Sequence, residues 1–104
     1  MPASKHQDLK QYRAIAHNLN PIIIVGDKGV NEGMLDELDR ALSDHELIKI
    51  KINTGDRDVR KTLLDEMLAS CKAELVQSIG KVAVLLRRNP KPNPKLSNLL
   101  RQQG

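Results

Sequence analysis

The stretch Ile22-Ile23-Ile24-Val25-Gly26-Asp27-Lys28-Gly29-Val30 decides how this chain folds. Its first residues form a short apolar run, which predicts a buried strand. The two glycines of the loop that follows carry no Cβ, so a ligand can come close to the backbone there. A helix pattern begins directly after the loop, and the free N–H groups of a helix N-terminus favour a phosphate. The stretch therefore predicts a loop that binds a nucleic-acid backbone, with an ordinary strand-to-helix turn as the alternative interpretation.

The segments on either side of this stretch have the apolar spacing of helices. Ser4 followed by Gln7 is a capping-box pattern that predicts the start of a first helix, which Asn20-Pro21 ends. Asn31 is a suitable N-cap for a second helix, and Asp56 for a third that continues to Cys71. Three helices are therefore expected, one before the apolar run and two after it.

Three further segments have the pattern of strands. Residues 47–52 alternate strictly, so that Lys49 and Lys51 point away from the isoleucines between them. Residues 74–79 and 82–87 predict a hairpin with its turn at Gly80-Lys81. Strands joined through helices are expected to be parallel and the final pair antiparallel. The fold class is therefore α/β, a four-stranded mixed sheet packed with three helices in the order α-β-α-β-α-β-β.

Length and composition indicate one globular unit. The 104 residues suffice for a single core, which we assign to residues 1–88, and residues 89–104 form a C-terminal tail that contains proline and lysine. Alternating prolines predict an extended start to this tail, and its leucines indicate a short terminal helix. No apolar run is long enough to span a bilayer, and no secretory signal is visible. The single Cys71 excludes an internal disulfide and is expected to be a buried thiol. We expect a cytoplasmic monomer that has no interaction with membranes.

The charge is distributed unevenly along the chain. The net charge is +4, yet residues 21–45 carry two bases against six acids, whereas residues 72–104 carry seven bases against one acid. A basic end opposite an acidic segment suggests a polyanion bound on one face only.

An enzyme interpretation finds little support in the sequence. The three histidines have no metal-ligand spacing with one another or with the cysteine, and the glycine loop lacks the Lys-Ser/Thr ending of a nucleotide-binding P-loop. We therefore expect no catalytic residues, no metal and no cofactor.

A nucleic-acid-binding interpretation explains the cations better. Each phosphate that a cation neutralises releases counterions, so a handful of contacts supports useful affinity. Tyr12 is the only aromatic residue and lies on the apolar face of the first helix, so structured RNA fits better than stacked single strands. The candidate RNA-binding residues are Gly26, Asp27, Lys28, Gly29, Lys49, Lys51, Arg57, Arg60, Lys61, Lys81, Arg87 and Arg88.

These residues also resemble a known family. The blocks Gly26-Asp27-Lys28-Gly29-Val30, His45-Glu46-Leu47-Ile48-Lys49-Ile50-Lys51 and Val84-Leu85-Leu86-Arg87 are similar to the YhbY/CRM domain, named for chloroplast RNA splicing and ribosome maturation. The resemblance spans roughly residues 5–88. Two positions depart from it, because Asn31 replaces a frequent Thr or Ser and Leu86 replaces a frequent Tyr.

The resemblance implies a fold and a function. It implies an RNA-binding module whose fold is similar to the C-terminal domain of translation initiation factor three, with a glycine loop like that of KH domains. Gly26, Lys28 and Gly29 would then contact the RNA backbone. Stand-alone bacterial members associate with precursors of the large ribosomal subunit, which implies structured ribosomal RNA as the partner.

One alternative stays open at this point. The acidic second helix, around Asp36, Glu37 and Asp39, could bind a basic protein such as a ribosomal protein. The chain would then be a protein-interaction module.

Overall fold

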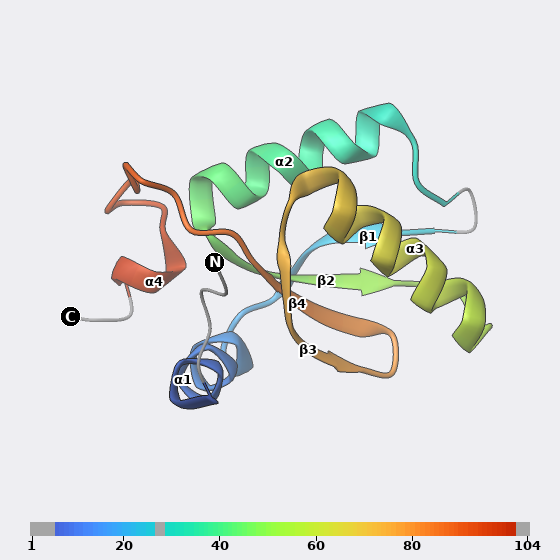
Figure 1. Ribbon diagram of the computed structural model, residues 1–104, viewed down its shortest axis with the longest axis horizontal. Helices are drawn as coiled ribbons and strands as arrows, with labels where there is room; N and C mark the ends of the chain where they lie inside the picture. The colour runs from blue at the N-terminus through green and yellow to red at the C-terminus, as the bar shows by residue number, and fades with distance from the viewer. Residues whose placement is uncertain (1–5, 27–28, 102–104) are drawn as a thin grey trace.

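The computed structural model describes residues 6–26 and 29–101, and within this part it confirms the predicted order of elements. The short terminal helix that the leucines of the tail indicated is α4. The predicted helix start at Ser4 lies outside the described residues. The elements are α1 (His6–His17), β1 (Pro21–Val25), α2 (Glu32–His45), β2 (Leu47–Ile52), α3 (Arg57–Cys71), β3 (Glu74–Ile79), β4 (Val82–Leu86) and α4 (Asn98–Arg101) (Figure 1).

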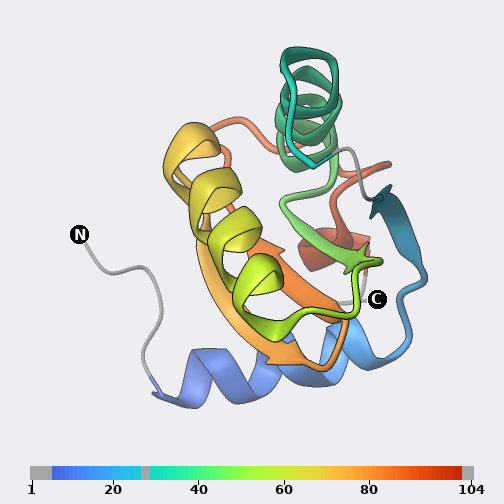
Figure 2. The ribbon, with the colours of Figure 1, turned by 90° about the vertical axis from the view of Figure 1, so that its right-hand side faces the viewer.

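The four strands form one mixed sheet in the order β1-β2-β4-β3. β1 pairs in parallel with β2, and β4 pairs antiparallel with both β2 and β3, so β2 and β3 run in the same direction. Helices α2 and α3 cover one face of the sheet and α1 lies on the other (Figure 2). The predicted mixed sheet is therefore confirmed.

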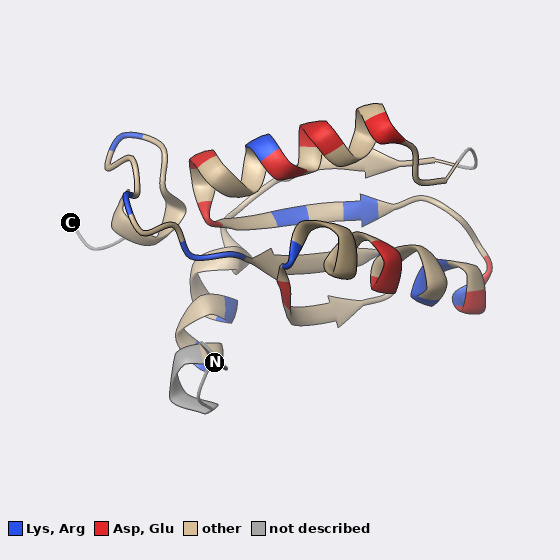
Figure 3. Ribbon diagram, turned by 45° about the horizontal axis from the view of Figure 1, so that its top comes forward, with Lys and Arg blue, Asp and Glu red and all other residues tan. Residues whose placement is uncertain are grey.

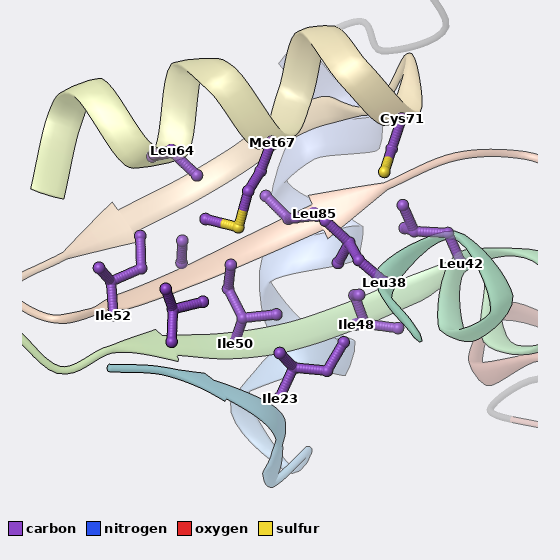
Figure 4. Packing of buried hydrophobic residues seen from close by; sticks show 12 residues of the cluster. Ile23, Leu38, Leu42, Ile48, Ile50, Ile52, Leu64, Met67, Cys71 and Leu85 are labelled. Atoms are coloured by element: carbon purple, nitrogen blue, oxygen red, sulfur yellow. The ribbon is translucent and has the colours of Figure 1, made fainter. Parts of the chain in front are cut away.

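The main core lies between the sheet and the pair α2 and α3. Leucines of α2 meet the isoleucines of β2 there, and Met67 of α3 lies above Leu85 of β4 (Figure 4). The alternation of β2 explains this packing, because every second residue points to the same face. The buried members are Ile23, Val25, Leu38, Leu42, Ile48, Ile50, Ile52, Leu64, Met67, Cys71, Ala83 and Leu85.

A smaller core lies under α1 on the opposite face. Tyr12 and Ala16 of α1 pack there on Val84 and Leu86 of β4, and Leu99 of α4 joins them. Tyr12 is buried, as the spacing of α1 predicted. Leu86, where the resemblance would have a frequent Tyr, is part of this core and is 1% exposed.

The prediction of a fully buried β1 is wrong for half of the strand. Ile23 and Val25 are buried, but Ile22 and Ile24 are 47% and 64% exposed. β1 lies at the edge of the sheet, and α1 contacts β2 and β3 on the other side of it. The apolar run therefore does form a strand, but helices cover only one face of it.

Both predicted helix caps are confirmed. Asn31 Oδ1 accepts a hydrogen bond from the Met34 backbone N–H at 2.9 Å. Asp56 Oδ1 accepts from the N–H groups of Asp58 and Val59 at 2.8 and 3.1 Å. Each cap satisfies N–H groups that have no partner inside the helix, and so fixes where α2 and α3 begin.

Residues 89–101 fold back onto the sheet through the buried side chain of Glu46. Its Oε1 accepts from Ser97 Oγ at 2.7 Å, and its Oε2 accepts from the Asn89 N–H at 2.8 Å. Asn98 Nδ2 donates to the Leu47 carbonyl at 2.6 Å, so the tail is bonded to the start of β2 at a second point. The segment with alternating prolines is thus held at both of its ends.

Candidate nucleic-acid interface

The glycine loop leaves the sheet at the end of β1. The Gly29 N–H donates to the Gly26 carbonyl at 3.0 Å, and this hydrogen bond closes the four-residue loop. Gly29 has a φ of +73°, which a residue with a Cβ rarely adopts. A Cβ on Gly26 would have no atom within 4 Å, so the fold itself does not require glycine there. Asp27 and Lys28, both predicted to bind RNA, lie outside the described residues.

Two backbone hydrogen bonds bring three loops to the same edge of the molecule. The Asn53 N–H donates to the Val25 carbonyl at 2.7 Å, immediately before Gly26. The Ile52 N–H donates to the Lys81 carbonyl at 2.7 Å, in the turn of the β3–β4 hairpin. The glycine loop, the β2–α3 loop and the hairpin turn therefore lie at one edge (Figure 2).

A groove of about 410 Å³ runs along this edge between α3 and the β3–β4 hairpin. Its floor is apolar, with Ile52 and Leu64 among its residues. Four of the predicted RNA-binding cations line it, namely Arg57, Arg60, Lys61 and Lys81. Three of these side chains come from α3, and Lys81 of the hairpin turn lies 20 or more residues after them in the sequence, so the fold brings the four together.

The four cations differ in how strongly the protein holds them. Arg57 and Lys81 are exposed at the surface of the groove. Arg60 is half-buried, and its Nη1 donates to the Thr54 carbonyl at 2.9 Å, which fixes the guanidinium at the start of α3. Lys61 Nζ lies 3.3 Å from Asp65 Oδ2, but both side chains are well exposed, at 76% and 61%. Such a surface pair is weak, so a phosphate can compete for Lys61.

The groove also contains residues that the sequence analysis did not select. Ser78 and Leu75 of β3 line it, as does Asp65 of α3. Leu75 lies on the face of the sheet that α3 covers, and the alternation of β3 in the sequence predicts this. Strict alternation would place Ser78 on the face opposite Leu75, but the register shift between Leu75 and Gln77 turns Ser78 toward the groove, and nothing in the sequence indicates that shift.

Lys49 and Lys51 lie on the opposite face of the sheet, as their alternation in β2 predicted. Both are half-buried. Lys49 lines a second groove, of about 350 Å³, whose other residues include Arg13 and His17 of α1. These lysines therefore do not share a surface with the groove between α3 and the hairpin.

Arg87 and Arg88 lie at the other end of β4, next to the tail. Arg87 Nη1 donates to Asp39 Oδ1 at 2.6 Å and to the Cys71 carbonyl at 3.0 Å. Its Nη2 donates to the Asp39 carbonyl at 2.9 Å and to Ser43 Oγ at 2.8 Å. Arg87 thus connects β4 to α2 and to the end of α3, whereas Arg88 is exposed beside the docked tail.

Acidic residues are spaced along α2, on the far side of α3 from the cationic groove (Figure 3). Glu32, Asp36, Glu37 and Asp39 are all exposed. A polyanion would be repelled along this helix, whereas the cations of the groove would attract it.

The described residues contain neither a metal-binding cluster nor a membrane-spanning helix. In residues 6–26 and 29–101, no group of three or more His, Cys, Asp or Glu side chains is arranged to hold a metal ion. Within the same part of the chain, no helix is both long and apolar enough to cross a membrane.

Comparison with known proteins agrees with this architecture. The sequence model of the CRS1/YhbY (CRM) domain matches residues 5–87. A protein of Pseudomonas aeruginosa named as a probable RNA-binding protein is 51% identical over 102 residues, which cover 98% of each chain. An RNA-binding protein of Haemophilus influenzae is 40% identical over 79 residues, which cover 75% of this chain and 80% of the relative. The solution structure of a Staphylococcus aureus protein superposes with a TM-score of 0.72 at 32% identity, covering 84% of this chain and 91% of the other.

The fold and the matched sequence together define a small α/β domain of a class whose relatives are named as RNA-binding proteins. The chain belongs to the CRS1/YhbY (CRM) domain family.

Proposed function

We propose that this chain binds structured RNA, without catalysis, through the edge formed by the glycine loop and the groove between α3 and the β3–β4 hairpin. The observation that carries the proposal is the convergence of Arg57, Arg60, Lys61 and Lys81 on one groove, beside the loop that begins at Gly26. The names of the relatives support RNA as the polyanion.

The groove would contact the RNA backbone rather than the bases. Arginine and lysine bind phosphate oxygens and so position a protein on its target without reading sequence. Gly26 has open space around it, which allows a phosphate to approach the main chain. Lys28 lies between the two glycines in the sequence and would add a further cation.

Structured RNA suits this surface better than a single strand. Proteins that bind single strands usually stack the bases on exposed aromatic rings. Tyr12 is the only aromatic residue of the chain, and it is buried under α1. Recognition through the backbone and the shape of a folded RNA needs no such ring.

The biological target that we propose is ribosomal RNA in a precursor of the large subunit. The resemblance to stand-alone members of the family supports this assignment. The test is sedimentation of cell extracts on a sucrose gradient, with the tagged chain followed by immunoblot. We expect the chain to travel with large-subunit precursors. Migration only at the top of the gradient, in cells that accumulate such precursors, would contradict the ribosomal assignment.

Direct binding is tested with charge reversals in and away from the groove. Arg57→Glu and Lys81→Glu should each raise the Kd for a structured fragment of large-subunit ribosomal RNA by about tenfold or more, because each removes a phosphate contact and adds repulsion. Lys91→Glu is the matched control, since Lys91 is exposed in the tail segment that follows Arg88. Equal losses in all three variants would indicate a general charge effect and would contradict a site at the groove.

The protein-interaction alternative makes a different prediction. If α2 bound a basic protein, Asp36→Asn and Glu37→Gln would abolish that interaction, whereas neutralising Lys28, Lys49 and Lys51 would leave it intact. We expect the two substitutions to leave RNA affinity unchanged or slightly higher, because they remove repulsion from a surface that RNA does not contact.

A further inference from the structure

Helices cover the two faces of the sheet to different extents. Helices α2 and α3 both cover one face, whereas on the other face α1 contacts β2 and β3 and the short α4 contacts β2. Beyond α1, the pairing registers place Ile24, Lys51, Val82 and Ile79 side by side in one row across all four strands. We call this row, together with Lys49, the isoleucine–lysine face.

The isoleucine–lysine face is unusually apolar for an uncovered surface. Ile24 and Ile79, at its two ends, are 64% and 65% exposed, while Lys51 and Val82 between them are half-buried. Large exposed apolar side chains that gather on one face mark an interaction site more often than single ones do. Four strands spaced by about 4.8 Å make the row roughly 14 Å wide, which is close to the 10–12 Å diameter of a helix with its side chains.

The charged side chains beside this face are basic. The groove of about 350 Å³ between α1 and the sheet is lined by Arg13, His17 and Lys49, and Lys51 lies in the adjacent row. Among the described residues, no Asp or Glu lines this groove. An occupant must therefore bring apolar side chains for Ile24 and Ile79 and negative charge for the lysines.

We propose that the isoleucine–lysine face docks an amphipathic helix of another protein, with an apolar stripe and acidic flanks, alongside α1. Such a helix would complete the second layer of the sheet, as α2 and α3 complete the first. A second copy of this chain is disfavoured, because a symmetric contact buries the same face of both copies and would bring lysines rather than acidic residues to this surface. RNA is disfavoured because aliphatic isoleucines offer its bases neither a stacking ring nor a hydrogen bond.

This proposal does not depend on RNA binding, and the peptide titrations that test it contain no RNA. The probe is a synthetic helical peptide of about 18 residues, or five turns, with a leucine stripe and glutamate flanks. The control peptide has the same stripe with lysine flanks. We expect the acidic peptide to shift the amide NMR signals of Ile24, Lys51 and Ile79 and the lysine peptide to leave them unchanged.

Two matched variants locate the contact. Ile79→Ser should raise the Kd of the acidic peptide about tenfold, whereas Leu75→Ser should leave it unchanged, because Leu75 is exposed on the same strand but lines the groove on the other face. Lys51→Glu should weaken the acidic peptide as well. Circular dichroism of each variant tests that it is folded, as expected for the exposed sites Ile79 and Leu75.

Several results would overturn the proposal. They are no binding of the acidic peptide at millimolar concentration, equal binding of the two peptides, or equal losses in Ile79→Ser and Leu75→Ser. A fall in RNA affinity in Ile79→Ser would assign the face to RNA instead. A wild-type dimer in analytical ultracentrifugation that Ile79→Ser dissociates would assign it to a second copy.

Discussion

At the scale of single residues, the two glycines of the loop have different reasons to be glycine. Gly29 has a positive φ, and a Cβ there would lie 3.4 Å from Leu63 Cδ2, so the fold constrains it. Gly26 has neither constraint. A glycine that the fold does not need is a candidate for close contact with a ligand. Substitution of Gly29 should therefore affect stability, and substitution of Gly26 should affect binding.

We therefore expect opposite outcomes from two alanine substitutions. Gly29→Ala should lower the free energy of unfolding by about 1–2 kcal/mol, because alanine is strained at positive φ. Gly26→Ala should change stability by less than about 0.5 kcal/mol but weaken RNA binding severalfold, since its methyl group occupies the space a phosphate would enter. Urea denaturation and RNA titration measure the two effects. Wild-type RNA affinity in Gly26→Ala would argue against backbone contact at this position.

The thiol of Cys71 gives a prediction about pH. Burial raises its pKa above the ordinary 9.0, the nearby carboxylate of Asp39 raises it further, and the guanidinium of Arg87 lowers it. Because the unfolded thiol ionises first, the free energy of unfolding should fall as pH rises from about 9 toward the native pKa. The stability difference between wild type and Cys71→Ala should shrink over this range in denaturant titrations. A difference that stays constant between pH 8 and pH 10 would contradict the raised pKa.

Residue-scale inference from the sequence succeeded where the partner is local. The caps Asn31 and Asp56 bond to residues two or three positions away, so their roles could be predicted from spacing. Arg87 could not be assigned in this way, because its partner Asp39 is 48 residues distant. An exposed arginine and a structural one look the same in a sequence until the fold places their neighbours.

At the scale of elements, the tail is the segment whose behaviour depends most on one side chain. Glu46 bonds to both Asn89 and Ser97, and it is 3% exposed. The tail then places Leu99 against the core under α1. The order of residues 89–101 should therefore depend on the carboxylate.

Glu46→Ala should lower the free energy of unfolding by about 2–4 kcal/mol, because it removes two hydrogen bonds and leaves buried donors without an acceptor. The amides of residues 96–101 should then exchange with deuterium much faster than in the wild type. Glu32→Ala, at an exposed site in the first turn of α2, is the control. Unchanged exchange in Glu46→Ala would show that the apolar contact of Leu99 holds the tail without Glu46.

The type of each main element could be predicted from apolar periodicity, but the partial exposure of β1 could not. The strand at residues 21–25 has no alternation in its sequence, so nothing in it indicates that Ile24 faces solvent. Its exposure follows from its place at the sheet edge beyond the reach of α1. Periodicity describes one element, whereas burial depends on which elements are neighbours.

At the scale of the whole molecule, strand order decides which cations meet. β4 lies between β2 and β3, and the hairpin turn with Lys81 therefore reaches the end of β2. The sequence predicted a mixed sheet with a terminal hairpin, but it left open on which side of β2 the hairpin pairs. Because of that choice, Lys81 joins Arg57, Arg60 and Lys61. Lys49 and Lys51 face away from them through the alternation of β2, whatever the strand order.

The measurement that tests the central claim most directly is the salt dependence of RNA binding. The logarithm of the association constant should fall linearly with the logarithm of salt concentration, with a slope that counts the phosphates contacted. In the double variant Arg57→Gln/Lys81→Gln, the slope should be smaller in magnitude by roughly 1.4–1.8, because about 0.7–0.9 is lost with each contact. In the control Lys91→Gln the slope should equal that of the wild type. A wild-type affinity that does not depend on salt, or a double variant with the wild-type slope, would contradict RNA binding at this groove.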